Sequence, residues 1–354
     1  MSLKNILQSA FKHVHMGVVI EGKSCEIYTT IMKKDHLVKH EKRLFELKND
    51  KLTNEITAYI KKYQDTYTYF YLATTLASIN QGAIAGCDDE TYHRMHIDTK
   101  NIVRVCIDGL WSVYSSQFDV DNTRLFFEPI GGLDYIFPME SVIHFLQHDL
   151  GREGTNLYIL NNRSTATIAI FDGPQLLYSS HFIFAEDEEE ELTLPQEEDE
   201  IDQLIDNEGE EGGDESVEEI VELDNLGGDL DNLDQIEDLD NFVADADNLT
   251  FEDVDTLEEE EFDEDVAPEM EPRDETSIKR DLLLYNFVKN SIEDYYKNDY
   301  YHSKFLERAV VFDTLGGSHS LNKYLRDELM IEGEIKNHDL AQVISLMSVK
   351  ETGS

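Results

Sequence analysis

One stretch of the sequence, residues 186–276, most constrains what this chain can fold into. It holds 43 Asp and Glu residues against a single basic residue, Arg273, and so carries 42 of the 47 net negative charges. Charges of one sign repel each other, and the few apolar residues here cannot offset the entropy lost on ordering the backbone. We therefore expect residues 186–276 to be a long disordered acidic insert. As a flexible coil its ends would lie on the order of 50 Å apart.

The remainder, residues 1–185 and 277–354, has the composition of an ordinary globular protein, with 33 acidic and 28 basic residues. Its 263 residues suffice for two domains of common size. The acidic balance argues against direct nucleic-acid binding, because phosphates would be repelled. No run of 18 apolar residues and no signal-peptide core is present, so a cytoplasmic location is the expectation.

The three cysteines, Cys25, Cys87 and Cys106, lie far apart and form no CxxC motif. This spacing predicts unpaired thiols in a reduced compartment rather than disulfides. The pair His93 and His96 follows two aspartates, but a solvated polar loop explains it better than a zinc site, and we predict no metal ligands.

The N-terminal residues 2–15 place their apolar side chains on one helical face. This predicts an amphipathic leader helix over residues 1–16. Such a helix either packs on its own domain or makes peripheral contact with a membrane or a partner.

After this leader, each half of the ordered chain opens with three strands, the first two joined by a tight turn. A helix over 139–150 ends the first half, and a further strand is expected at 124–128. The expected opening strands are residues 17–20, 25–32 and 37–47 in the first half, and 156–160, 166–171 and 175–184 in the second. The repeated order indicates an internal duplication at the level of structure.

The letters GVVIEGKS at residues 17–24 satisfy the P-loop spacing G-x-x-x-x-G-K-[ST]. A working P-loop needs a strand before its first glycine and a helix after its lysine, since its backbone amides hold phosphate only in that context. Here residues 25–32 alternate as a strand. We therefore interpret the motif as a hairpin turn.

The paired hairpins resemble those of the actin-like ATPase fold, in particular the PilM family of pilus-assembly proteins and the cytoplasmic part of the GspL family of type II secretion. The segments VVIEGKSCEIY (18–28) and LYILNNRSTATIAIFDG (157–173) look like the two hairpins, and AVVFDTLGGSHSL (309–321) is similar to the family's strand–Gly-Gly–helix adenosine motif. The resemblance implies an α/β fold of duplicated actin-like (ribonuclease H-like) domains. The first lobe would span 17–154 and the second 155–185 plus 277–350.

In that family the hairpin turns hold phosphate and a magnesium ligand, and this sequence departs from the pattern. Aligning Ser164 and Thr165 with the family's Ser-Thr puts Ile159 where a carboxylate should be and Asn161 where a glycine should be. In the first hairpin only Glu21 can stand in for the aspartate. Hydrolysis by this route needs carboxylate–metal chemistry, so the resemblance implies a pseudo-ATPase with no catalytic residues.

The cofactor expected for such a chain is none, or ATP with magnesium bound weakly at the three turns. The candidate cofactor-binding residues are Glu21, Gly22, Lys23, Ser24, Asn161, Arg163, Ser164, Thr165, Gly316, Gly317 and Ser318.

Three functions stay open at this point. The first is a cytoplasmic scaffold of a type IV pilus or type II secretion-like machine, peripheral at the inner membrane, that binds the cytoplasmic tail of a bitopic membrane partner. The second is an active actin-like ATPase that uses Glu21 and either Asp134 or Asp313. The third is an acidic regulatory protein that binds a basic partner through residues 186–276.

Overall fold

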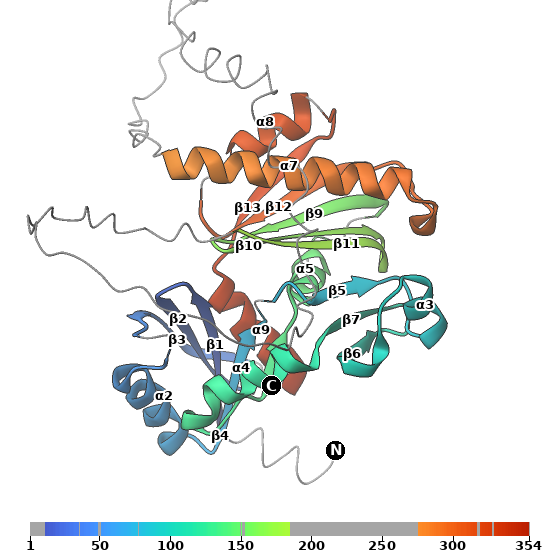
Figure 1. The fold of residues 1–354 in the computed structure, drawn as a ribbon. Coiled ribbons are helices and arrows are strands. Elements are labelled where there is room, and N and C mark those ends of the chain that lie inside the picture. Colours follow the sequence, from blue (N-terminus) through green and yellow to red (C-terminus); the bar gives the residue numbers. More distant parts are fainter. Residues whose placement is uncertain are drawn as a thin grey trace, which may run out of the picture. The chain divides into compact units, whose positions relative to one another are not determined.

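Two five-stranded sheets that share one strand order form the frame of the protein (Figure 1). Most of the expected acidic insert lies outside the described residues, and only its last two residues, 275 and 276, belong to a described helix. The computed structural model describes residues 11–34, 36–48, 51–76, 78–148, 150, 153–184, 275–316, 319–327 and 329–353.

The first sheet has the order β3-β2-β1-β4-β8. Strands β1, β2 and β3 form an antiparallel meander, while β4 and β8 continue the sheet parallel to β1. Its strands are β1 (Lys12–Glu21), β2 (Ser24–Lys33), β3 (His36–Glu46), β4 (Tyr69–Thr75) and β8 (Tyr135–Phe137).

The second sheet repeats this arrangement in the order β11-β10-β9-β12-β13. The central strand β9 is antiparallel to β10 and parallel to β12, as β1 is to β2 and β4. Its strands are β9 (Thr155–Asn161), β10 (Thr165–Asp172), β11 (Gln175–Ile183), β12 (Arg308–Asp313) and β13 (Gly333–Asn337). The expected duplicated α/β fold of the actin-like type is therefore confirmed.

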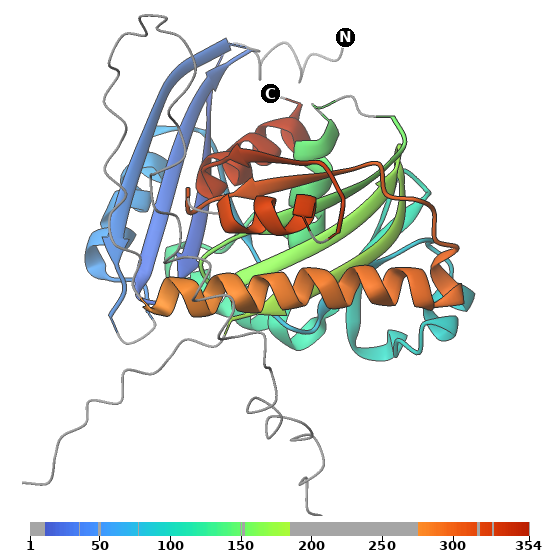
Figure 2. The same cartoon turned by 90° about the horizontal axis from the view of Figure 1, so that it is seen from above.

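One face of each sheet is covered by helices from its own half of the chain. Helix α2 (Asn54–Thr66) begins at the N-cap Thr53 and buries Ile56 and Ile60 against the first sheet. Helix α7 (Glu275–Lys297) runs along the second sheet beside α8 (His319–Asp327) and buries Leu284, Val288 and Ile292 there (Figure 2). None of the described helices is both long and apolar enough to cross a membrane.

A small sheet of the order β5-β7-β6 is inserted in the first half. It consists of β5 (Gln81–Ile84), β6 (Ile102–Ile107) and β7 (Trp111–Ser116), with α3 (Asp89–Arg94) and the short helix η1 (Thr99–Asn101) between β5 and β6. A disulfide joins Cys87 to Cys106 here, so the expectation of unpaired thiols was wrong for these two residues. The two cysteines are 19 residues apart in the sequence, and the turns around α3 bring them together. Cys25 is free and buried.

Two expected elements differ from the structure. Residues 124–128, expected as a strand, belong to α4 (Gln117–Phe127) and to the start of η2 (Glu128–Ile130). The prediction of a leader helix was wrong for residues 12–16, because strand β1 begins at Lys12. Within this strand, the rings of His13 and His15 stack on tyrosines of β4. Residues 1–10 lie outside the described part of the chain.

The two halves exchange one helix each. Helix α5 (Met139–His148) follows the first sheet in sequence but packs on β9 and β10. Helix α9 (Leu340–Thr352) follows the second sheet but packs on β1, β2 and β4. The second lobe was expected to include residues up to 350, but its last helix packs on the first sheet.

Helix α9 is held on the first sheet by close backbone approach and by buried hydrogen bonds. Ser345 Oγ donates to the carbonyl oxygen of His15 at 3.0 Å and lies 2.7 Å from Thr30 Oγ1. A Cβ on Gly17 would lie 2.1 Å from the carbonyl oxygen of Ala341. Gly17 is therefore a packing glycine of β1 and not part of a phosphate loop.

We predict that Gly17→Ala lowers the free energy of unfolding by about 1–3 kcal/mol, because the added methyl group meets backbone atoms of α9 that must shift. Urea denaturation measures this loss. Gly173→Ala is the control: its φ is +57° but no atom lies near the added methyl group, so only backbone strain of about 1 kcal/mol opposes it. Equal losses in the two variants would contradict the close packing of α9.

Glu140, in the first turn of α5, is fully buried. Ser179 Oγ donates to its Oε1 at 3.3 Å, and its Oε2 has no hydrogen-bond partner among the described residues. Burial raises the pKa of Glu140 to about 7. The folded state therefore favours the neutral carboxyl group, and ionisation of Glu140 opposes folding.

A raised pKa contributes stability that is complete below the unfolded pKa of about 4.5 and lost as pH rises through about 7. We predict that at pH 8 the free energy of unfolding of Glu140→Gln exceeds that of the wild type by on the order of 3 kcal/mol. This difference should vanish near pH 4.5. Urea denaturation across this range gives the difference curve. The exposed Glu351→Gln is the control, and a difference curve that is flat with pH would refute the burial effect.

Candidate functional site

The turns of both hairpins and the loop after β12 converge on one cleft. The cleft has a volume of about 300 Å³. It is lined from the first hairpin by Glu21 and Ser24, from the second by Arg163, and from the loop after β12 by Thr314 and Leu315. Parallel pairing of β9 with β12 explains this convergence, because it brings Asn161 beside Asp313 at the ends of both strands.

Glu21 joins the two lobes at this cleft. Its carboxylate accepts hydrogen bonds from the backbone N–H groups of Arg163 and Ser164 in the second turn. Burial raises the pKa of Glu21, and the positive charges of Arg163 and Arg280 act in the opposite direction. The last residue of β1 thus occupies the backbone donors of the opposite hairpin.

Behind the turn lies a buried polar network built on Asn161. Its Nδ2 donates to Asp313 Oδ1 at 3.0 Å, and its Oδ1 accepts from the guanidinium of Arg280 at 2.6 Å. Arg280, from α7, also donates to the carbonyl oxygen of Asn162 and lies over the ring of Phe184 at 4.4 Å. Burial lowers the pKa of Arg280, and the neighbouring carboxylates oppose this effect. The network fixes the second turn from the side of α7.

A second group of charges closes the cleft from the side of α9. Lys42 Nζ lies 3.0 Å from Glu26 Oε1 and 2.8 Å from Asp339 Oδ2. Asp339 is also the N-cap of α9 and accepts from the backbone N–H of Gln342 at 2.9 Å. Burial raises the pKa of Glu26; burial also opposes ionisation of Asp339, but its hydrogen bonds prevail and lower its pKa. Strands β2 and β3 are thereby tied to α9.

The alignment with the family puts Ile159 at the place of the carboxylate. Ile159 is fully buried in the core between the second sheet and α7 and does not face the cleft. Asn161 ends β9 as Glu21 ends β1, so Asn161 holds the corresponding position. An amide therefore stands there, and its oxygen and nitrogen are bonded to Arg280 and Asp313.

Some of the other predicted residues lie at the cleft and others do not. Ser24 Oγ donates to the carbonyl oxygen of Glu21 at 2.9 Å, and Thr165 is buried beside Asn162. Gly22 and Lys23 are exposed in the turn, away from the cleft lining. Gly316 is exposed with φ at +75°. Gly317 and Ser318 lie outside the described residues.

Sequence reasoning missed Arg280, Lys42 and Asp339, and named Asp313 only in connection with hydrolysis. No local motif marks Arg280, whose partners lie more than a hundred residues away in the sequence. Asp134, also considered for hydrolysis, accepts from the backbone N–H of Leu72 at 2.8 Å on the neighbouring strand and does not line the cleft. No group of three or more His, Cys, Asp or Glu side chains in the described part of the chain is arranged to hold a metal ion.

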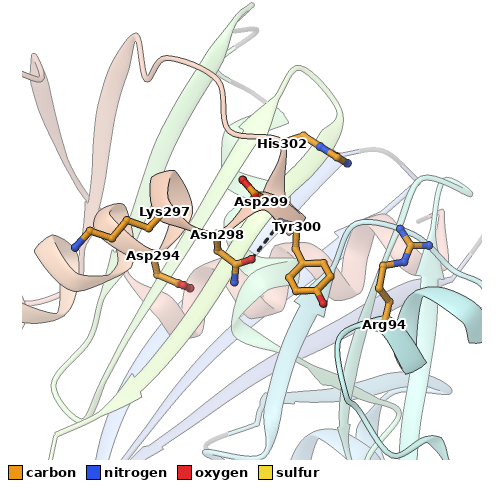
Figure 3. Close-up of a pocket in the computed structure, with 7 residues that line it drawn as sticks. All are labelled: Arg94, Asp294, Lys297, Asn298, Asp299, Tyr300 and His302. Carbon is orange, nitrogen blue, oxygen red and sulfur yellow. Dashed lines mark hydrogen bonds between the residues drawn. The ribbon is translucent and has the colours of Figure 1, made fainter.

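A larger hollow of about 800 Å³ lies elsewhere, between the end of α7, the short helix η4 (Asp299–Tyr301) and α3 (Figure 3). Arg94 lies across it from Tyr300, whose backbone N–H donates to Asn298 Oδ1 at 3.1 Å. None of the predicted site residues lines this hollow. The smaller cleft, where the hairpins meet, is therefore the candidate site.

Solved structures that resemble this chain include a Bacteroides thetaiotaomicron protein described as having an actin-like ATPase fold and unknown function. It shares 9% identity at a TM-score of 0.44, covering 98% of this chain and 99% of that one. A PilM–PilN type IV pilus biogenesis complex shares 10% at a TM-score of 0.45, with coverages of 95% and 98%. The ethanolamine utilization protein EutJ from Carboxydothermus hydrogenoformans shares 12% at 0.38, with coverages of 94% and 89%. No curated protein matches the sequence.

Two family models match the sequence, and they meet between the two lobes. The model described as "Domain of unknown function (DUF8569)" matches residues 11–144, which contain the first sheet and the small sheet. The second matching model covers residues 157–353, more than half of the chain and almost all of the second sheet together with α9. The chain therefore belongs to the family described as "Domain of unknown function (DUF8341)".

Proposed function

We propose that this chain is a non-catalytic or weakly nucleotide-binding scaffold with the actin-like fold. The scaffold would act at the cytoplasmic face of the inner membrane, as part of a type IV pilus or type II secretion-like machine. The observation that carries the proposal is the carboxylate of Glu21 on the backbone donors of Arg163 and Ser164. That contact joins the end of β1 to the turn of the opposite hairpin.

Backbone N–H groups in a turn of this kind are the natural binding groups for a phosphate. A phosphate at the second turn would have to displace Glu21 or lie beside its negative charge, and either costs binding free energy. Asn161 and Asp313 are also bonded within the chain. The polar groups of the cleft are therefore used to position the two hairpins relative to each other.

The family resemblance of the hairpins supports a partner of a particular kind, the cytoplasmic tail of a bitopic inner-membrane assembly protein. A basic tail of this kind would be attracted to the chain, which carries a net charge of −47. A negative field of this size raises the encounter rate with basic segments. The scaffold would then recruit its partner by charge and hold it by specific contacts.

Of the two forms of this proposal, a non-binding and a weakly nucleotide-binding scaffold, the cations at the cleft favour the second. Arg163 and Arg280 both act on Glu21, and they would face a phosphate if that carboxylate were neutral. The two candidates therefore differ in a single measurable property, the affinity for Mg-ATP with and without the charge of Glu21.

We predict that isothermal titration with Mg-ATP gives no saturable heat for the wild type, because Glu21 occupies the phosphate donors. Glu21→Gln removes the competing charge and should bind at least about tenfold more tightly. Glu46→Gln, an exposed carboxylate on β3, is the matched control and should behave as the wild type. Tight wild-type binding with ATP turnover that disappears in Glu21→Gln would instead establish the ATPase.

For the partner, we predict that the full-length chain, crosslinked in cells and purified from membranes, captures an inner-membrane assembly protein through its cytoplasmic tail. The variant lacking residues 186–276 should still capture it, since the ordered lobes are proposed to form the docking site. Loss of capture on this deletion would favour the acidic regulatory function. Absence of any inner-membrane assembly protein from both samples would contradict the scaffold.

A further inference from the structure

Strand β3 forms a long open edge of the first sheet. It runs for 11 residues and, among the described residues, pairs only with β2. The opposite edge strand, β8, has 3 residues. An unpaired strand edge presents a row of backbone donors and acceptors that can bind another extended chain.

The outward-pointing backbone groups of β3 can be assigned from its end. The N–H of Leu47 donates to the carbonyl oxygen of Lys23 at 2.7 Å, so it points toward the first hairpin. Because hydrogen-bonding directions alternate along a strand, the N–H groups of Glu46, Leu44 and Lys42 point away from β2. These donors lie on the open edge.

The side chains of β3 do not protect this edge against every partner. Leu37, Val38 and Leu44 are exposed by 57%, 47% and 69%. Edge strands are commonly blunted by proline, short length, a bulge or charged side chains, and β3 has a register irregularity near Val38 and cations at Lys39 and Arg43 but neither proline nor short length. Exposed apolar side chains beside free backbone donors are typical of a strand that receives another strand.

The charge around β3 is opposite to that of the chain as a whole. Residues 33–51 contain seven Lys and Arg against four Asp and Glu. Lys39 and Arg43 share the single carboxylate of Glu41, at 2.9 and 2.7 Å, and their hydrogen bonds lower its pKa to about 2. One carboxylate for two cations leaves a positive charge at the middle of the strand.

We propose that the outer edge of β3 docks an extended acidic segment of a partner protein, one in which carboxylates alternate with apolar side chains. Carboxylates on one face of an added strand would meet Lys39 and Arg43, and apolar side chains would cover Leu37, Val38 and Leu44. A second copy of this chain fits poorly, because antiparallel pairing about Glu41 would oppose Lys39 to Arg43. The surface is separate from the cleft function proposed above.

The test is fluorescence anisotropy with the full chain and a labelled peptide as long as β3, in which glutamate alternates with valine and threonine. Saturable binding should weaken as ionic strength rises. The same peptide with glutamine for glutamate should bind at least about tenfold more weakly. Hydrogen exchange should show new protection within residues 36–46 on peptide binding.

Two pairs of variants separate charge from backbone bonding. Lys39→Glu with Arg43→Glu should weaken binding by at least about tenfold, whereas a matched reversal of the exposed Lys61 and Lys323 should leave it unchanged within about twofold. Leu44→Pro removes one outward N–H and should also weaken binding by about tenfold. Leu44→Thr keeps the N–H and should stay within about twofold. Circular dichroism and urea denaturation verify that each variant is folded.

Three results would overturn the proposal. One is equal or tighter binding of the glutamine peptide. Another is unchanged affinity in folded Leu44→Pro together with protection outside residues 36–46. The third is peptide binding only after removal of residues 186–276, which would assign the edge to the chain's own acidic segment and not to a partner.

Discussion

The contact between Gly17 and α9 is the constraint on which the arrangement of the lobes depends. With no side chain at Gly17, the helix backbone approaches β1 so closely that a Cβ there would meet the carbonyl oxygen of Ala341. Because α9 follows the second sheet in sequence, this contact carries the end of the second half onto the first. It also fixes Asp339, the N-cap of α9, beside Lys42 of β3. The loop after β12 and the first hairpin are consequently held on opposite sides of one small cleft.

Within that cleft, Glu21 takes the role that a bound anion has at a phosphate-binding turn. A carboxylate on two backbone N–H groups gains hydrogen bonds, but its burial raises its pKa and so opposes ionisation. Arg163 and Arg280 offset part of this cost by their charge. Whether the charged form of Glu21 is favoured in this contact therefore depends on the neighbouring cations. This is why a single neutral substitution at Glu21 is expected to convert a closed contact into an anion site.

Local patterns predicted those parts of the fold that local physics determines. The two-residue turns at Gly22 and Gly173 have left-handed backbone, and the alternating apolar residues around them predicted the β1–β2 and β10–β11 hairpins. The convergence of the turns followed from the order of the strands. By contrast, the Cys87–Cys106 disulfide, the packing of α9 on β1 and the position of Arg280 depend on contacts between distant residues. The amphipathic pattern of residues 2–15 misled for a similar reason, since residues 13–16 are buried on both faces of β1 and no period distinguishes such a strand from a buried helix.

The cleft and the edge of β3 differ in what a ligand must break in order to bind. At the cleft, the donors of Arg163 and Ser164 and the amide of Asn161 already have partners within the chain, so a phosphate must break those bonds first. Along β3, the outward N–H groups of Lys42 and Leu44 pair with no described residue, so a peptide displaces only water. The cost of binding is therefore lower along the strand than at the turns. Of the two surfaces, the outer edge of β3 is therefore the one where fewer hydrogen bonds within the chain oppose a ligand.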